Sequence, residues 1–190
     1  MIAGLVLAAG AGTRFGSKSK LLAELDGRPL LEHAVEAACA VAELERVVVV
    51  VGAQAPEIRR RVRFGRAEVV VCPDWERGQS FSLRCGVRAL PEVAKVIVTL
   101  GDAPRIGPAV IARFLDQPPG SRAVYRGRPG HPVVLGEAEL AALDTVHGDV
   151  GAKELLTGGN LIECGDLSAG TDVDTPRDLE AIRDETRAIL

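Results

Sequence analysis

Five consecutive valines at positions 47–51 constrain the fold of this chain more than any other feature. An unbroken run of β-branched residues is typical of a strand covered on both faces, whereas a strand with one wet face alternates apolar and polar residues. Similar apolar runs occur at 2–7, 68–72 and 95–100. Stretches with helical spacing separate them. This alternation predicts a largely parallel sheet with right-handed crossovers.

These elements predict a Rossmann-like, three-layer α/β/α sandwich that forms one domain over residues 1–190. Helices are expected at 29–41, 56–63, around 83–90, 108–115, 137–143, 151–156 and from 175 onward, and short strands at 123–126, 132–135 and 161–164. Pro29 and Pro176 are expected to open helices, and Ser80 or Ser82 to cap the helix that follows it. The region 122–172, rich in glycine and proline, is expected to carry substrate specificity.

Composition excludes several classes of function. The chain has 190 residues, of which 47% are hydrophobic and 26% charged, as in a globular domain. Its net charge of -3 gives no general attraction to nucleic acid, and no apolar run approaches the ~20 residues of a membrane span. Four cysteines without metal-ligand spacing predict reduced thiols and a cytoplasmic location. We therefore expect neither nucleic acid nor membrane as a partner.

A loop of small residues after the first strand is the main functional signal. The chain reads Leu7-Ala8-Ala9-Gly10-Ala11-Gly12-Thr13-Arg14 and then reaches Lys18 and Lys20. Small residues let backbone amides approach anionic oxygens, and the three cations add charge. Asp102 follows the strand at 95–100, and ligands of such sheets bind beyond the carboxyl ends of the strands. The loop and Asp102 are therefore expected to face one crevice that binds a nucleoside triphosphate.

Three better-known glycine-containing motifs do not fit. A dinucleotide fingerprint would need glycine at position 15, which is Phe15, and an acidic residue after the second strand, where Gln54 stands. A Walker loop fails because Ser17 follows Gly16. A serine-hydrolase elbow fails because Ser82 stands where a glycine is needed.

The remaining pattern resembles the superfamily of MobA-like nucleotidyltransferases. Four segments match in order: the loop from Leu7 to Leu22, Gly78-x-x-x-Ser82-Leu83-x-x-Gly86-Val87, Gly101-Asp102-x-Pro104 and Asp172-Val173-Asp174-Thr175-Pro176. The segments 128–133 and 148–153 are similar to the branch of molybdenum cofactor cytidylyltransferases. Two departures are Lys153, where arginine is expected, and the three-residue spacer 17–19. The resemblance implies the fold of nucleotide-diphospho-sugar transferases.

The implied reaction is transfer of CMP from CTP to the terminal phosphate of molybdopterin or the molybdenum cofactor, with release of pyrophosphate. Arg14 is expected to hold the β- or γ-phosphate, and Lys20 to reach the α-phosphate. Asp102 and Asp174 are expected to bind Mg²⁺, or Mn²⁺ in its place, because hard oxygens suit both. A molybdoenzyme or its maturation chaperone is a further expected partner.

The same resemblance assigns the remaining side of the site. The nucleotide is expected to contact Leu7, Ala8, Ala9, Gly10, Gly12, Thr13, Gly78 and Ser82. The methyl group of Ala9, where the guanylyl branch has glycine, favours cytosine by narrowing the pocket. His131, Asp149 and Lys153 are expected to face the acceptor.

Several alternatives remain open from the residues alone. His131 is equally consistent with a structural histidine, and Asp149 with Lys153 could form a surface pair. At the level of function, the alternatives are a related transferase that uses GTP or another phosphate acceptor, and a nucleotide-binding regulator without catalysis.

Overall fold

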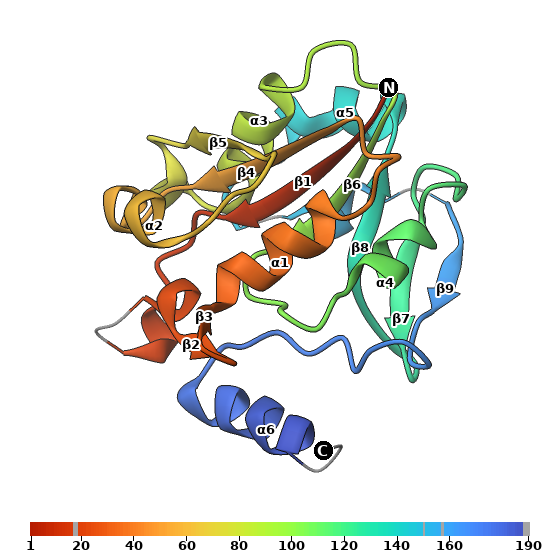
Figure 1. Cartoon of the computed structure of the whole chain (residues 1–190). Helices are drawn as coiled ribbons and strands as arrows, with labels where there is room; N and C mark the ends of the chain where they lie inside the picture. The colour runs from red at the N-terminus through yellow and green to blue at the C-terminus, as the bar shows by residue number, and fades with distance from the viewer. Residues whose placement is uncertain (17–18, 150, 157, 188–190) are drawn as a thin grey trace.

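A seven-stranded sheet forms the centre of the computed structural model, which describes residues 1–16, 19–149, 151–156 and 158–187 (Figure 1). Lys18, one of the three cations of the first loop, lies outside the described residues.

The strands are β1 (Ile2–Ala8), β4 (Arg46–Val51), β5 (Glu68–Val71), β6 (Lys95–Leu100), β7 (Arg122–Tyr125), β8 (Arg128–Leu135) and β9 (Leu161–Glu163), and their order is β5-β4-β1-β6-β8-β7-β9. β5, β4, β1 and β6 pair in parallel, as do β7 and β9. β8 alone is antiparallel to its neighbours. The predicted mostly parallel sheet is confirmed.

Burial along β4 explains the valine run. Each of the five valines is at most 1% exposed. Val47, Val49 and Val51 pack on one face, and Val48 and Val50 on the other, because successive side chains of a strand point to opposite sides. Because both faces of β4 are covered, none of the five side chains faces water, and an apolar residue is favoured at each position.

Helices complete the two outer layers (Figure 1). On one face the core includes residues of α1 (Leu30–Cys39), α2 (Ala55–Arg61) and α4 (Pro108–Ala112). On the other it includes residues of α3 (Gln79–Arg88), with α5 (Glu137–Ala141) packed against it. The last helix, α6 (Pro176–Arg187), joins a third cluster with the hairpin of β2 (Glu24–Leu25) and β3 (Arg28–Pro29). This cluster buries Leu25 and Leu30 against Leu179 and Ile182.

Several predicted boundaries are corrected by the structure. α3 starts at Gln79 with Gly78 at the N-cap, so neither Ser80 nor Ser82 caps it. Pro29 precedes α1 rather than opening it. The stretch predicted as a helix at 151–156 is a short 3-10 turn, Ala152–Leu155. β8 is one strand from Arg128, whereas only 132–135 was expected to be extended. Among the described residues, the helices all lack the length or the apolar character needed to cross a membrane.

Candidate functional site

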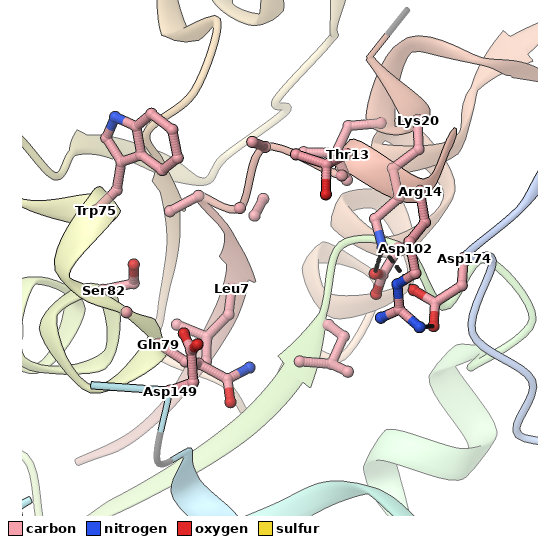
Figure 2. Close-up of a pocket in the computed structure, with 18 of the residues that line it drawn as sticks. Leu7, Thr13, Arg14, Lys20, Trp75, Gln79, Ser82, Asp102, Asp149 and Asp174 are labelled. Atoms are coloured by element: carbon pink, nitrogen blue, oxygen red, sulfur yellow. Dashed lines mark hydrogen bonds and ion pairs between the residues drawn. The ribbon is translucent and has the colours of Figure 1, made fainter. Parts of the chain in front are cut away.

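A cavity of about 360 Å³ lies at the carboxyl ends of β1 and β6 (Figure 2). Its lining residues are Leu7, Ala8, Ala9, Gly10, Ala11, Gly12, Thr13, Arg14, Lys20, Leu21, Trp75, Glu76, Gly78, Gln79, Ser82, Leu100, Asp102, Asp149 and Asp174. The structure thus brings together all residues predicted to bind nucleotide or metal or to catalyse. Of the three predicted acceptor residues it includes Asp149 alone.

One end of the cavity is a cluster of four charged side chains. Lys20 Nζ lies 2.5 Å from Asp102 Oδ2 and 3.0 Å from Asp174 Oδ1. Arg14 Nη1 lies 3.1 Å from Asp174 Oδ2. Lys20 and Asp102 are largely buried, with side chains 13% and 18% exposed, whereas Arg14 is 75% exposed. Two cations of the first loop therefore face two carboxylates from distant parts of the chain.

Backbone geometry sets these positions. Gly12 adopts a left-handed conformation with φ 61°, and a Cβ there would lie 2.9 Å from Lys20 Cγ. Glycine thus lets the stem of Lys20 pass close to the loop on its way to the carboxylates. The amide of Val173 donates a 2.8 Å hydrogen bond to the carbonyl of Asp102, which holds the segment of Asp174 beside the end of β6.

The two carboxylates converge on one cation. Burial by itself lowers the pKa of Lys20, but the charges and hydrogen bonds of Asp102 and Asp174 outweigh it and raise the pKa above its ordinary 10.5. Lys20 is therefore an ammonium at neutral pH. Because Asp102 and Asp174 already direct hard oxygens at a single point, the pair fits a divalent cation whose other ligands are water and phosphate. Among the described residues, no cluster of three or more His, Cys, Asp or Glu offers a fuller metal site.

The opposite end of the cavity is less charged. Figure 2 shows Trp75, Ser82, Gln79 and Asp149 together, away from Lys20 and Asp102. Trp75 packs on Gly52, where a Cβ would lie 2.5 Å from Trp75 Cγ. The carbonyl of Ala9 accepts a 3.0 Å hydrogen bond from the amide of Ala53, which fixes the loop edge facing this end.

Gly78 lies where the start of α3 packs against the backbone of Gly148 and Asp149. Its φ is 110°, and a Cβ there would lie 2.2 Å from the carbonyl carbon of Gly148. We expect Gly78→Ala to lower the free energy of unfolding by about 2 kcal/mol or more, because backbone strain and a backbone clash both oppose it. Nucleotide binding should weaken with it. Urea denaturation measures the effect, and Gly107→Ala is the control because a Cβ there meets nothing within 4 Å. Equal stability of the two variants would contradict this role.

Two predicted acceptor residues lie outside the cavity. His131 is in β8, where its carbonyl accepts a 2.5 Å hydrogen bond from Tyr125 Oη. Burial, followed by the charges of Arg122 and Lys153, lowers the pKa of its imidazole to about 4. Lys153 Nζ lies 3.5 Å from Glu154 Oε1, so among the described residues Lys153 pairs with Glu154 and not with Asp149. His131 thus lies within the sheet, and neither His131 nor Lys153 lines this cavity.

A second cavity of about 300 Å³ was not anticipated from the sequence. It is lined by Tyr125, Arg128, Pro129, Ala169, Gly170, Thr171 and Asp172. Asp172, one of its lining residues, stands two residues before Asp174, which lines the first cavity. Trp75, Glu76 and Gln79 also line the first cavity but are not predicted from the sequence. Trp75 and Glu76 lie shortly before the Gly78-x-x-x-Ser82 pattern, and Gln79 lies within it.

Comparisons with known proteins agree with this geometry. Nicotine blue oxidoreductase from Paenarthrobacter nicotinovorans is 36% identical in an alignment that covers 92% of this chain and 92% of that protein. The structure of Rv0371c from Mycobacterium tuberculosis H37Rv superimposes with a TM-score of 0.82 at 26% identity, covering 96% of this chain and 97% of that one. The same mycobacterial protein has been solved in complex with manganese. A nucleotidyl transferase from Methanothermobacter gives a TM-score of 0.83 at 24% identity, covering 100% and 99%.

The chain also matches bifunctional GlmU proteins, of which it spans between 22% and 34%. The family model described as the MobA-like NTP transferase domain matches residues 4–164, which include most of the sheet and all the lining residues of the first cavity except Asp174. Because this match covers most of the chain, the chain belongs to the MobA-like NTP transferase family.

Proposed function

We propose that this nucleotidyltransferase transfers CMP from CTP to the terminal phosphate of molybdopterin or the molybdenum cofactor and releases pyrophosphate. The observation that carries the proposal is the position of Lys20, between Asp102 and Asp174 at one end of a cavity whose other end, among its described lining residues, holds Trp75 and Ser82 and no cation. Transfer of a nucleotidyl group depends on positioning and charge neutralisation and needs no protein nucleophile.

Each charged residue has a distinct role in this proposal. Arg14, which is exposed on the lining of the cavity, binds β- or γ-phosphate oxygens. Lys20 gives up carboxylate contacts for the α-phosphate, where negative charge builds as the bond to pyrophosphate breaks. Asp102 and Asp174 would hold Mg²⁺ or Mn²⁺, which would neutralise charge on the phosphates. The residues of this chain thereby place and polarise the triphosphate.

The first loop is consistent with a preference for cytosine. Ala9 lines the cavity, but it is only 4% exposed and belongs to the hydrophobic cluster on the α3 face, so a glycine there would open space behind the cavity lining. We expect Ala9→Gly to shift the ratio of kcat/KM for CTP to that for GTP toward GTP by about tenfold, since a purine needs the space. Pyrophosphate release with each triphosphate measures the ratio. An unchanged ratio would remove Ala9 from base selection.

We propose that the acceptor binds in the second cavity. Arg128 lines it as an exposed cation, and Asp172 of its lining stands two residues before Asp174 of the nucleotide cavity. An acceptor bound there would present its terminal phosphate to the α-phosphorus, in line with the departing pyrophosphate. A molybdoenzyme or its maturation chaperone would then receive the finished cofactor.

Pyrophosphate release tests the proposed reaction. The enzyme is mixed with Mg²⁺, molybdopterin and each of the four ribonucleoside triphosphates in turn. We expect acceptor-dependent release with CTP. Preference for GTP would assign the chain to another MobA-like activity, and binding without release would make it a regulator.

An oxidoreductase is a second candidate because the similarity to nicotine blue oxidoreductase extends over 92% of both chains. It would need a redox cofactor, and Phe15 and Gln54 stand where a dinucleotide fingerprint would need glycine and an acid. Incubation with nicotine blue and a reduced nicotinamide cofactor tests it. We expect no dye-dependent oxidation above the rate without protein, and a clear rate would favour this candidate.

A further inference from the structure

Asp149 lies at the end of the cavity that the proposed function gives to the base. Figure 2 shows its carboxylate beside Gln79, on the same side as Ser82 and apart from Lys20. It lines the same cavity as Trp75 and Ala9. This is not the position expected of a residue that holds the acceptor, which must approach the phosphates.

The segment that carries Asp149 is fastened to α3. Ser80 donates two hydrogen bonds to the carbonyl of Gly148, from its amide at 3.1 Å and from its Oγ at 3.0 Å. Arg84, 9% exposed, donates from Nη1 to the carbonyls of Leu143 at 2.9 Å and Val146 at 2.6 Å. Because α3 also carries Ser82 and has Gly78 as its N-cap, one helix sets the position of Asp149 relative to the end of the cavity that holds Trp75, Gln79 and Ser82.

The carboxylate has spare hydrogen-bonding capacity. Among the residues that the structure describes, neither a hydrogen bond nor an ion pair is recorded for Asp149, whereas Asp102 and Asp174 are both paired. An ionised carboxylate only accepts hydrogen bonds. It therefore attracts an exocyclic amine, as in cytosine, and repels a carbonyl oxygen, as at the same ring position of uracil.

We infer that Asp149 is a specificity-determining residue that accepts a hydrogen bond from the exocyclic amine of the base and so selects CTP over UTP. The inference rests on the proposed use of CTP and replaces the acceptor role predicted for Asp149. Asp149→Asn supplies an amide that can donate as well as accept, so it pairs with either pyrimidine. The variant should bind UTP better and CTP less well.

The test compares binding and turnover of CTP and UTP. Trp75 is the chain's only tryptophan and lines the cavity, so its fluorescence reports the Kd of each nucleotide in the presence of Mg²⁺. We expect Asp149→Asn to reduce the ratio of CTP affinity to UTP affinity by roughly ten- to a hundredfold, the range for a hydrogen bond to a charged group. The ratio of kcat/KM values should move equally. Asp144→Asn, an exposed carboxylate on the same segment and outside the cavity, is the matched control and should leave both ratios unchanged.

The outcomes separate this inference from the proposed function. If the wild type turns over CTP and Asp149→Asn leaves the CTP/UTP ratio unchanged, the inference fails and the proposed function stands. If the variant instead raises only the KM for the acceptor, Asp149 serves the acceptor and the inference is overturned. If the wild type binds CTP tightly but never releases pyrophosphate, the proposed function fails, and the affinity ratio alone decides the role of Asp149. A wild type that binds neither nucleotide contradicts both.

Discussion

Asp102→Ala should reduce CTP-dependent pyrophosphate release by about a thousandfold or more while leaving the fold intact. Loss of this carboxylate removes one of the two proposed protein ligands for the divalent cation, and such an ion contributes several kcal/mol of charge stabilisation in the transition state. Each ~1.4 kcal/mol is a factor of ten in rate. The cost to folding should be small, because Lys20 keeps its 3.0 Å ion pair with Asp174.

Steady-state rates and thermal unfolding together check this expectation. Asp116→Ala, an exposed aspartate outside the cavity, controls for loss of one negative charge. A rate within a few-fold of the wild type would remove Asp102 from the catalytic residues. A collapse of the melting temperature would instead show that its contribution is structural.

Lys20→Ala is expected to have the second largest effect. Its kcat should fall by roughly 10²–10³-fold, as when one preorganised donor to a developing negative charge is lost. The same change leaves Asp102 and Asp174 facing each other without the ammonium that now joins them. Their mutual repulsion should make the carboxylates better ligands for a divalent cation in the absence of nucleotide.

The two effects of Lys20→Ala therefore have opposite signs. Turnover should fall while the affinity for Mn²⁺ alone rises, and titration calorimetry with Mn²⁺ measures the second effect without activity. Arg59→Ala, which removes an exposed cation of α2, is the matched control and should change neither quantity. Weaker binding of Mn²⁺ to Lys20→Ala would contradict the assignment of Asp102 and Asp174 as its ligands.

The strands and the charged end of the cavity were predictable because their signals are local. The five valines had to lie in a strand with two covered faces, and the carboxyl ends of parallel strands had to bring Asp102 to the first loop. Sequence reasoning therefore placed the loop with Arg14 and Lys20 beside Asp102, the family resemblance added Asp174, and the structure brings these four side chains together.

The remainder depends on contacts that no local pattern encodes. The reversed direction of β8 is set by its pairing with β6 and β7, and the same pairing places His131 in the sheet. Asp149 reaches the base end through the bonds between Ser80 and Gly148, which are 68 residues apart. The N-cap of α3 was mispredicted because Gly78, at φ 110°, turns the chain into the helix before either serine.

A structure of the protein with CTP and Mg²⁺ tests the central claim most directly. The triphosphate should lie between the amides of the first loop and the side chains of Arg14 and Lys20, with the metal ion on Asp102 and Asp174 and the cytosine beside Trp75. A triphosphate bound at the Trp75 end, or a metal ion away from both aspartates, would contradict the account.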